Sequence, residues 1–523
     1  MSAKPGKSLK KLIDLIPFCL KTSPKFGDCM IRGVKYDSRK IIPGDIYIAL
    51  IGGNFDGHDF IKDAVNHGAA AIVGSKTGLS LEVPYLEVPD TRKALAYLSA
   101  AFYGFPGEKM VVIGVTGTDG KTTTANLIYQ ILITAGLNAG LISTINALIG
   151  DRVLDTGFHV TTPEAPDVQK YLSIMVEEGI THVVIETTSH GLAQDRVTGC
   201  SFDIGVVTNI THEHLDYHKS YEGYFSAKAR LFEFLTESKP PLKSIEPLAV
   251  LNKDDGSFEK LDKIIQVKKV SYGVSQEADI VAKDIISTDE GLQFSVTGPG
   301  FTDVFQCPLL GEYNVANCLA AISTAVVGLG ISVKNASRGI SAIQDIPGRM
   351  ERLEMGQDFT AIVDFAHTPN ALESALKAAR KLTDKRVIAI FGSAGLRDRE
   401  KRRMMAKTSI DLADISILTA EDPRTESLST ILQEMANEAN RSGGQEGINY
   451  WLVEDRGEAI RKGVKMAQPG DVVIACGKGH EQSMCFDLIE YAWDDRIAMK
   501  AALADLLHKN GPDMPYLPTQ DQG

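Results

Sequence analysis

The chain has 523 residues, of which 44% are hydrophobic and 23% are charged, and its formal net charge is −12 at pH 7. This length allows about three domains, each with its own core, and the acidic balance argues against a nucleic-acid partner, which requires a basic face. No apolar run approaches the roughly 18 residues that cross a membrane. We expect a cytoplasmic protein with no membrane span, and a monomer.

Residues 1–107 form the first predicted domain, which ends in a linker at 104–107. In chain order we expect a strand at 44–50, a helix at 59–67, a strand at 69–73 and an amphipathic helix at 91–103. Two polar clusters fall in its turns, one at Ser38 and the other at Gly57 and His58. Ordinary turn chemistry explains both clusters, so neither identifies a ligand by itself.

The second predicted domain, residues 108–344, opens with a buried strand, a glycine-bearing turn and a helix that runs to about residue 135. The turn allows a close approach to a ligand, and the free N–H groups at the helix start favour an anion. Lys121 is placed to reach outer phosphates and Thr122 to bind Mg²⁺. The order therefore predicts a nucleotide phosphate site. Its spacing is unusual, because Val115 stands where a P-loop normally has its first glycine.

Polar residues also follow the later strands of this domain. After a strand at 139–143, Thr162 precedes a helix that we expect to run to about residue 178, and Thr162 is equally explained as the cap of that helix. The strand at 182–185 ends at Glu186. Because strand-end acids of parallel sheets face the ligand crevice, Glu186 is a candidate Mg²⁺ ligand.

The strand at 202–207 leads to a histidine-rich loop, and the helix expected at 221–235 carries Lys228. The loop spacing of the histidines disfavours zinc, and a single histidine that joins Glu186 on a metal is the better interpretation. For Lys228 a solvated position on the helix is the ordinary explanation. The segment 280–307 predicts a small antiparallel excursion, and an alanine-rich helix follows it to about residue 329.

In the third predicted domain, residues 345–523, strands alternate with helices, which predicts a parallel sheet with right-handed crossovers. We expect strands at 360–364, 386–391, 414–419 and 471–475, of which 471–475 is the last clear one. Each strand is followed by a polar cluster, which is where parallel sheets bind ligands. We expect residues 511–523 to be disordered.

Taken together, these clusters resemble the Mur ligase family over essentially the whole chain. The loop 117–122 is similar to the family's Gly-Thr-Asn-Gly-Lys-Thr, with Asp119 in place of Asn, and segments 208–218, 311–317, 347–349 and 364–367 match its other motifs in order. The resemblance implies an α/β fold of three domains. A central P-loop domain with a parallel sheet is flanked by an N-terminal substrate-binding α/β domain and a C-terminal α/β domain similar to a dinucleotide fold.

Within the family, segments 186–194, 364–369 and 477–481 are most similar to members that add the third, diamino, residue of the peptidoglycan stem peptide. The resemblance implies that ATP, with Mg²⁺, phosphorylates the D-glutamate carboxylate of UDP-N-acetylmuramoyl-L-alanyl-D-glutamate. The amine of the diamino acid then attacks the acyl phosphate, and phosphate leaves.

The same match implies a role for each site residue. Catalysis is assigned to Lys121, Glu186, His214 and Lys228, and the metal ligands are Thr122, Glu186, His214 and a carbamylated Lys228 (N6-carboxylysine). ATP is assigned to Gly117, Thr118, Asp119, Gly120, Lys121, Thr122, Thr123, Asn317, Arg349, Asp364 and His367. The UDP-muramoyl-dipeptide is assigned to Ser38, Gly57, His58, Thr161, Thr162, Thr188, Gln194 and Arg196. The incoming amino acid is assigned to Arg397, Asp422, Arg424, Gly477 and Glu481.

The sequence leaves the incoming amino acid open. The diaminopimelate enzymes of the family carry Asp-Asn-Pro-Arg, whereas this chain has Glu421-Asp422-Pro423-Arg424. Arg424 indicates a distal carboxylate, hence meso-diaminopimelate, which we favour. The extra negative charge of Asp422 indicates a bare ammonium, hence L-lysine or L-ornithine.

Two further interpretations are a related ATP-dependent ligase and a protein of a different class. A folylpolyglutamate-type ligase is disfavoured by the long first domain and by the segment 421–426. A non-catalytic sensor that binds ATP has no need of Lys121, Glu186, His214 and Lys228 together.

Overall fold

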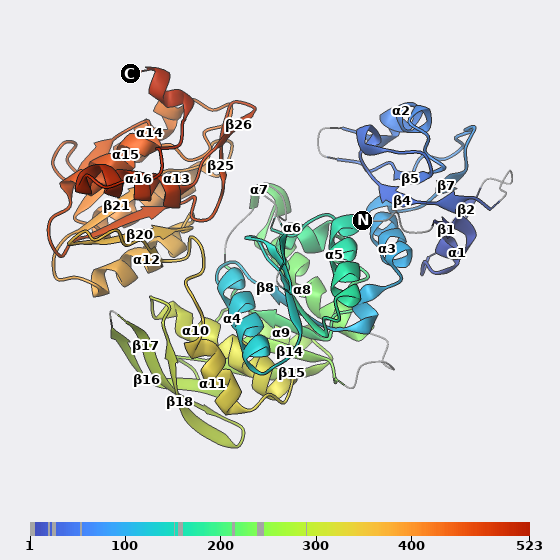
Figure 1. Cartoon of the computed structure of the whole chain (residues 1–523), viewed down its shortest axis with the longest axis horizontal. Coiled ribbons are helices and arrows are strands. Elements are labelled where there is room, and N and C mark those ends of the chain that lie inside the picture. The colour runs from blue at the N-terminus through green and yellow to red at the C-terminus, as the bar shows by residue number, and fades with distance from the viewer. Residues whose placement is uncertain are drawn as a thin grey trace.

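The computed structural model describes residues 6–522 except 19–20, 23–27, 53–54, 151, 155–160, 212–214, 238–244 and 289. Three sheets, each made by a separate part of the chain, account for most of the strands. Figure 1 shows them as three bodies along the chain, blue, cyan to yellow, and orange to red. The predicted three-domain α/β fold is confirmed. In the described part of the chain, no helix is long and apolar enough to cross a membrane.

The N-terminal sheet is five-stranded, in the order β2-β7-β6-β5-β4. Its strands are β2 (Lys21–Thr22), β4 (Gly33–Lys35), β5 (Asp45–Ile48), β6 (Ala71–Gly74) and β7 (Tyr85–Glu87), and the last four run parallel. Helix α3 (Thr91–Tyr103) packs on one face through Leu95 and Leu98. Helix α2 (Ile61–Asn66) packs on the other face through Ile61 and Ala64. The strands β1 (Lys7–Ser8) and β3 (Met30–Ile31) form a separate two-stranded sheet, and the short helix α1 (Leu9–Asp14) follows β1.

The central sheet has eleven strands, and β8 (Val111–Thr116) lies between β12 (His182–Glu186) and β13 (Ile204–Val207). On one face pack α4 (Lys121–Thr134), α10 (Tyr313–Ile322) and α11 (Val333–Ser341). On the other face pack α5 (Ala165–Glu177), α8 (Tyr221–Glu237) and α9 (Phe258–Ile264). The parallel part is completed by β9 (Ala139–Ile142), β14 (Leu248–Asn252) and β15 (Lys268–Gly273).

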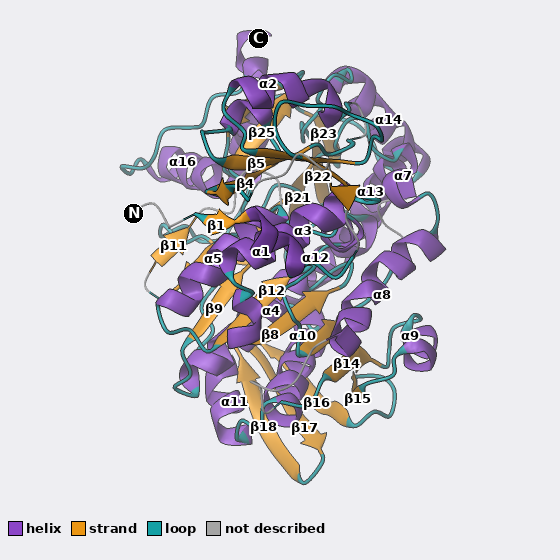
Figure 2. Cartoon of the chain, turned by 90° about the vertical axis from the view of Figure 1, so that its right-hand side faces the viewer, coloured by secondary structure: helices purple, strands orange, loops and turns teal. Residues whose placement is uncertain are grey.

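Antiparallel strands extend both edges of the central sheet. The predicted excursion is confirmed as β16 (Ile280–Thr288), β17 (Gly291–Gly298) and β18 (Phe301–Cys307), which project at the end of the molecule opposite the C-terminus (Figures 1 and 2). β16 joins β15 in parallel, and the three strands pair antiparallel with one another. The hairpin of β10 (Ala147–Ile149) and β11 (Arg152–Leu154) at the other edge was not predicted. After α10 the chain continues as a π-helix at Ser323–Gly328.

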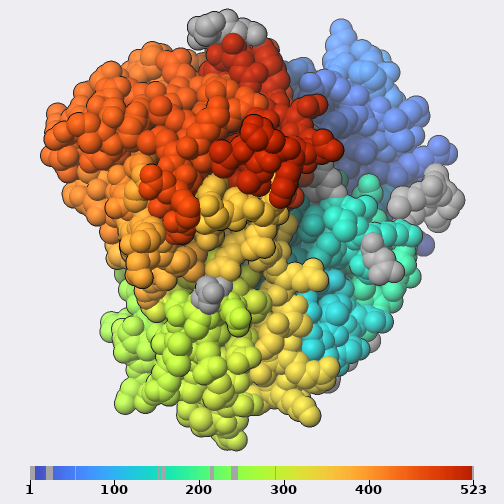
Figure 3. Space-filling view, turned by 60° about the vertical axis from the view of Figure 1, so that its left-hand side comes forward, coloured from blue at the N-terminus to red at the C-terminus, as the bar shows by residue number. Residues whose placement is uncertain are grey.

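The C-terminal sheet has the order β19-β20-β24-β21-β22-β23. Its strands are β19 (Glu351–Arg352), β20 (Thr360–Asp364), β21 (Val387–Phe391), β22 (Ile415–Leu418), β23 (Tyr450–Leu452) and β24 (Val472–Cys476), and only β19 is antiparallel. One face is covered by α12 (Pro369–Lys381), α13 (Arg399–Leu412) and α14 (Leu428–Arg441), the other by α15 (Arg456–Met466) and α16 (Asp495–Leu507). Figure 3 shows this domain, orange to red, lying against the green-to-yellow part of the central domain.

One hairpin of this domain was not predicted, and one prediction was wrong. The hairpin of β25 (Ser483–Phe486) and β26 (Ile489–Ala492) follows the last clear strand of the sequence. The tail is ordered rather than disordered, because Leu517 is fully buried and the Thr519 hydroxyl donates to Asp455 Oδ2 at 2.7 Å. A single buried leucine is enough to anchor a segment whose composition otherwise indicates disorder.

Leu517→Ala is therefore expected to lower the free energy of unfolding of the C-terminal domain by about 2–4 kcal/mol, the usual cost of a buried Leu→Ala change. The protein's two tryptophans, Trp451 and Trp493, both lie in this domain, so tryptophan fluorescence in a denaturant titration measures the change. Leu488→Ala is the matched control, since Leu488 is 89% exposed. Equal midpoints for the two variants would contradict an anchored tail.

Candidate active site

Two glycines of the loop between β8 and α4 have backbone conformations that require glycine. Their φ angles are 149° at Gly117 and 81° at Gly120. A Cβ at Gly117 would lie 1.8 Å from Thr208 Oγ1, and one at Gly120 would lie 2.3 Å from Asn317 Oδ1. Glycine is thus required both for the turn and for the close packing of residues from two other segments.

The loop is held by the end of the neighbouring strand β13. The backbone N–H of Thr118 donates to the Asn209 carbonyl at 2.8 Å, and that of Asp119 donates to Asn209 Oδ1 at 2.9 Å. Lys121, the first residue of α4, donates from Nζ to the Thr118 carbonyl at 2.7 Å. Its ammonium therefore lies over the loop, where a phosphate at the helix start would be held.

Thr122 and Glu186 lie side by side because β12 pairs with β8, with Glu186 opposite Val115. The Thr122 hydroxyl donates to both carboxylate oxygens of Glu186, at 3.0 and 3.1 Å, and the two residues are 2% and 1% exposed. The backbone N–H of Thr144 donates to Glu186 Oε2 at 3.0 Å. Arg349, from the linker to the C-terminal domain, donates to the Thr122 hydroxyl at 3.2 Å. Carboxylate, hydroxyl and guanidinium thus meet at one buried point.

Lys228 is not the solvated helix lysine of the ordinary explanation. It is 1% exposed, and its Nζ donates to the Gly117 carbonyl at 2.5 Å and lies 4.6 Å from the centre of the Tyr224 ring. Helix α8 therefore brings it to the back of the phosphate-binding loop. The predicted partner His214 lies outside the described residues.

A hydrogen-bonded network joins most of the residues predicted to hold the muramoyl dipeptide. The Thr162 hydroxyl donates to the Glu186 carbonyl at 3.1 Å and lies 3.1 Å from Thr188 Oγ1. Arg196 donates from Nη1 to the Thr162 carbonyl at 2.8 Å and from Nη2 to Gln194 Oε1 at 2.8 Å. Thr162 does not cap α5, as the ordinary explanation required, because the N-cap is Glu164. Thr161 lies beside this network in sequence.

The end of β4 in the N-terminal domain faces the same network. Burial raises the pKa of Tyr36 to about 12, and the carboxylates of Glu164 and Asp167 add to the rise while Arg196 opposes it. Ser38, two residues later, is 5% exposed and begins a 3₁₀ turn. The predicted uridine contact at Ser38 stays a prediction.

Gly57 and His58 are used inside their own domain. The backbone N–H of Ser75 donates to His58 Nε2 at 2.9 Å, so Nδ1 carries the proton and donates to Asp56 Oδ1 at 2.6 Å. Gly57 donates from its N–H to the Leu50 carbonyl at 2.7 Å. Both ring nitrogens of His58 are therefore occupied, and a uridine contact here stays a prediction.

The residues predicted for the rest of ATP come from α10 and the C-terminal domain. The Thr124 hydroxyl donates to Asn317 Oδ1 at 3.3 Å, which fixes Asn317 against α4. Asp364, at the end of β20, accepts from the Met350 N–H at 2.7 Å, and burial raises the pKa of its carboxyl. The Arg349 guanidinium lies 4.4 Å from the centre of the Phe365 ring. His367 follows two residues later, with Nδ1 3.2 Å from the Phe365 carbonyl.

Three loops at the carboxyl edge of the C-terminal sheet are held together by hydrogen bonds. Gly395 N–H donates to the Asp422 carbonyl at 2.9 Å, and Cys485 N–H donates to Asp422 Oδ1 at 3.0 Å. Asp422 and Arg424 have φ angles of 40° and 54° on either side of Pro423. Left-handed conformations of two non-glycine residues are uncommon and occur where surrounding structure enforces them, often at functional sites. Lys478, in the loop that carries Gly477 and Glu481, donates to Asp422 Oδ1 at 3.0 Å. This loop and those that carry Arg397, Asp422 and Arg424 therefore form one unit.

A buried arginine, Arg402, stabilises this unit of loops through ion pairs. Arg402 donates from Nη2 to Glu426 Oε2 at 2.6 Å and from Nη1 to Glu434 Oε2 at 3.1 Å. Its hydrogen bonds lower the pKa of Glu426 to about 2. Glu426 also accepts from the Leu396 N–H at 2.8 Å, so it fixes the loop that carries Arg397.

Comparison with known proteins finds relatives over most of the chain. Residues 30–103, 115–325 and 348–479 match the Mur ligase family catalytic domain, the Mur ligase middle domain and the Mur ligase glutamate ligase domain. The UDP-N-acetylmuramyl-tripeptide synthetase of Roseiflexus sp. (strain RS-1) is 42% identical over 485 residues, 91% of this chain and 95% of that protein. The chain belongs to the Mur ligase family.

Two further relatives of this Mur ligase carry a more specific name. A protein from Geobacillus thermodenitrificans (strain NG80-2) named UDP-N-acetylmuramoyl-L-alanyl-D-glutamate--2,6-diaminopimelate ligase is 40% identical over 92% of this chain and 96% of its own. A solved structure of a ligase with the same name is 30% identical and has a TM-score of 0.63. The match covers 92% of this chain and 96% of that one.

Several residues that build the site of this Mur ligase were not singled out from the sequence. Asn209 holds the loop through both its carbonyl and its side-chain amide. The Thr144 N–H holds the Glu186 carboxylate through a backbone group, which no side-chain pattern signals. Glu426 and Arg402 were not assigned a role from the sequence, because they pair with each other and stabilise the loop at Leu396. Lys478 stands between the matched Gly477 and Glu481, and only the structure shows that it pairs with Asp422.

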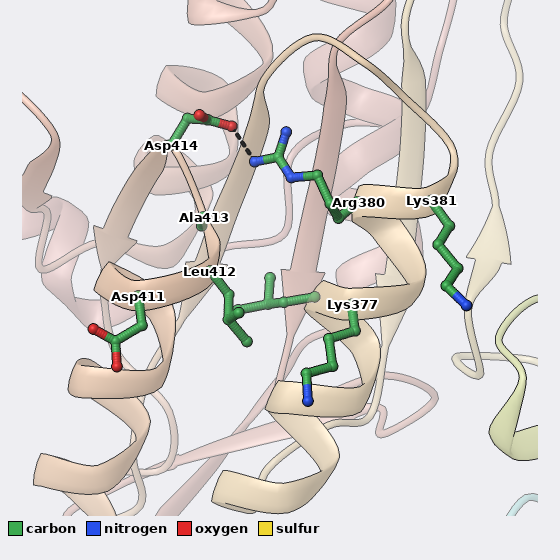
Figure 4. A pocket seen from close by; sticks show the side chains of 8 residues that line it. Lys377, Arg380, Lys381, Asp411, Leu412, Ala413 and Asp414 are labelled. Atoms are coloured by element: carbon green, nitrogen blue, oxygen red, sulfur yellow. Dashed lines mark hydrogen bonds and ion pairs between the residues drawn. The ribbon is translucent and has the colours of Figure 1, made fainter.

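Of two cavities of the Mur ligase, one lies away from the predicted site residues and the other includes one of them. One of about 510 Å³ lies between α12 and α13, and Figure 4 shows Arg380 paired there with Asp414. Its lysines are likewise paired, Lys377 with Glu373 and Lys381 with Glu312, so it offers no free charge to a ligand. The second, about 370 Å³, lies at the domain junction and includes Arg349.

Proposed function

We propose that this Mur ligase uses ATP to join meso-diaminopimelate to the D-glutamate of UDP-N-acetylmuramoyl-L-alanyl-D-glutamate, in peptidoglycan biosynthesis. The observation that carries the proposal is the meeting of Thr122, Glu186 and Arg349 at the start of α4, with the Lys121 ammonium on the adjoining P-loop. The names of the relatives support the substrate, and L-lysine or L-ornithine is the alternative.

The first step brings together two anions, the D-glutamate carboxylate and the γ-phosphate, so their repulsion has to be cancelled. Lys121 would place its ammonium on the outer phosphates, and the loop N–H groups would hold them at the start of α4. Arg349 would bring a second cation from the linker. These fixed charges act where negative charge develops, at little cost of reorganisation.

The oxygen ligands at this point suit Mg²⁺. Thr122 and Glu186 are both buried and offer a hydroxyl and a carboxylate, which Mg²⁺ prefers together with phosphate oxygens. In the described residues no group of three or more His, Cys, Asp and Glu side chains could hold a metal by itself, so substrate oxygens would complete its shell. Bound there, Mg²⁺ would neutralise phosphate charge. A second Mg²⁺ would be held by His214 and a carbamylated Lys228.

The remaining residues would position the acceptor and the amine. Arg196, with Thr162 and Thr188 around it, would hold a carboxylate or phosphate of the muramoyl dipeptide. Arg397, Arg424 and Glu481 would hold the incoming amino acid at the carboxyl edge of the C-terminal sheet. Closure of that domain over the P-loop would exclude water from the hydrolysable acyl phosphate.

Substrate dependence of phosphate release tests the proposal against its rivals. The ligase is expected to release phosphate only when ATP, Mg²⁺, the UDP-muramoyl-dipeptide and the amino acid are all present. A sensor that hydrolyses ATP would not need the amino acid, and a folylpolyglutamate-type enzyme would need a folate acceptor. Phosphate release without the amino acid would contradict the proposal.

A further inference from the structure

The pocket proposed for the incoming amino acid contains one lysine paired with two carboxylates. Lys478 Nζ lies 3.0 Å from Asp422 Oδ1 and 2.5 Å from Glu481 Oε2. The Lys478 side chain is 1% exposed, that of Asp422 is 12% and that of Glu481 is 22%. Because removing one partner of a buried ion pair leaves an uncompensated charge, each carboxylate in this cluster depends on Lys478.

The ammonium of Lys478 stays charged in this setting. Burial lowers the pKa of Lys478, but Glu481 and Asp422 raise it by more, so that it lies above its usual range. The backbone N–H of Cys485, at the hairpin β25–β26, also donates to Asp422 Oδ1 at 3.0 Å. The negative charge of Asp422 is thus satisfied within the protein before any substrate arrives.

Arg424 stands apart from this cluster. Its N–H donates to the Cys485 carbonyl at 3.1 Å, and the Asp487 N–H donates to the Arg424 carbonyl at 2.9 Å. Within the residues that the structure describes, no ion pair engages its guanidinium. The hairpin therefore fixes the backbone of Arg424, while its positive charge remains available to a carboxylate.

Apart from Arg397, which would hold the α end of the amino acid, the charged residues of the pocket named above balance. Lys478 and Arg424 contribute two positive charges, and Asp422 and Glu481 contribute two negative charges. The neighbouring carboxyl of Glu421 lies against Gly477, where a Cβ would come within 2.4 Å of its Oε2, and burial raises its pKa. Lys401, Arg456 and His367 act in the opposite direction on that carboxyl. All the candidate amino acids share the same α end, which Arg397 would hold, so only the distal end can distinguish them.

We propose that Lys478 is a specificity-determining residue of this Mur ligase. By holding the charges of Asp422 and Glu481, Lys478 keeps the pocket beside Arg424 neutral and selects an amino acid whose distal end carries both an ammonium and a carboxylate. Diaminopimelate has such an end, whereas lysine and ornithine have a bare ammonium. The inference rests on the proposed ligation, and it explains why Asp422 does not make this enzyme a lysine ligase.

A double-mutant cycle tests the inference, with kcat/KM for diaminopimelate and for L-lysine measured by phosphate release. Lys478→Met leaves the pocket with one excess negative charge, so the ratio of diaminopimelate to lysine is expected to fall at least about tenfold. Asp422→Asn leaves one excess positive charge and is expected to keep or increase the wild-type ratio. The double variant, with both charges removed, is expected to return towards the wild-type ratio.

Each outcome decides between clear alternatives. An unchanged ratio in a folded Lys478→Met variant would overturn the inference. If that variant does not fold, Asp422→Asn and the double variant carry the test, and a shift of either towards lysine would overturn it. Thermal unfolding of every variant identifies loss of fold. A wild-type protein that turns over neither amino acid would contradict the proposed function itself, whereas a diaminopimelate-specific wild type with insensitive variants would contradict only the role of Lys478.

Discussion

Lys121→Met is expected to lower kcat for phosphate release at least about 10²–10³-fold, the usual effect of removing one preorganised donor to a developing charge. The ammonium of Lys121 lies over the P-loop, 2.7 Å from the Thr118 carbonyl. Methionine keeps the length and the apolar stem of the side chain but removes the charge that would meet the γ-phosphate. Steady-state phosphate release with all substrates at saturation measures the effect.

Lys283→Met is the matched control, because Lys283 is an exposed residue of β16 in the same domain. The control is expected to retain wild-type activity, and both variants are expected to unfold at the wild-type temperature. Near-wild-type turnover in Lys121→Met would remove the P-loop lysine from the mechanism.

Lys228→Ala is expected to lower activity about 10²-fold or more, on the same scale as the loss of one electrostatic contact in the site. The buried Lys228 lies 2.5 Å from the Gly117 carbonyl, so it touches the loop that would carry the phosphates. As a carbamate, the side chain would offer an oxygen ligand, which an ammonium cannot do. We therefore expect a short carboxylic acid, such as acetate or formate, to restore part of the activity of the alanine variant.

The rescue separates a ligand role from a packing role. Chloride at the same ionic strength serves as the control, since it changes screening without supplying a carboxylate. If Lys228 only packed against Tyr224, neither salt would restore turnover. Full activity in Lys228→Ala without added acid would contradict the assignment.

The order of motifs along the chain was sufficient to predict the three-domain α/β fold and the family. A strand, a glycine turn and a helix place the P-loop, and the structure brings Thr122 to Glu186 because β8 and β12 are neighbours in the sheet. Neighbouring strands are not adjacent in sequence, so that contact depends on topology. The antiparallel hairpin β10–β11 was missed for a different reason, because each of its strands has only three residues and shows no clear alternation of apolar and polar residues.

Other features depended on single contacts that no pattern encodes. Thr162 precedes a helix as a capping residue would, yet its hydroxyl donates to the Glu186 carbonyl. Residues 511–523 have the composition of a disordered tail, yet Leu517 is buried against the C-terminal domain. The charge of Asp422 pointed towards lysine only while its partner Lys478 was unknown.

The most direct test of the account is the identity of the amino acid that the enzyme adds. Purified protein with ATP, Mg²⁺ and the UDP-muramoyl-dipeptide would be given equal concentrations of meso-diaminopimelate, L-lysine and L-ornithine, and the nucleotide product weighed by mass spectrometry. The account predicts a product heavier by one diaminopimelate residue. A product that carries lysine or ornithine, or no new nucleotide product at all, would contradict it.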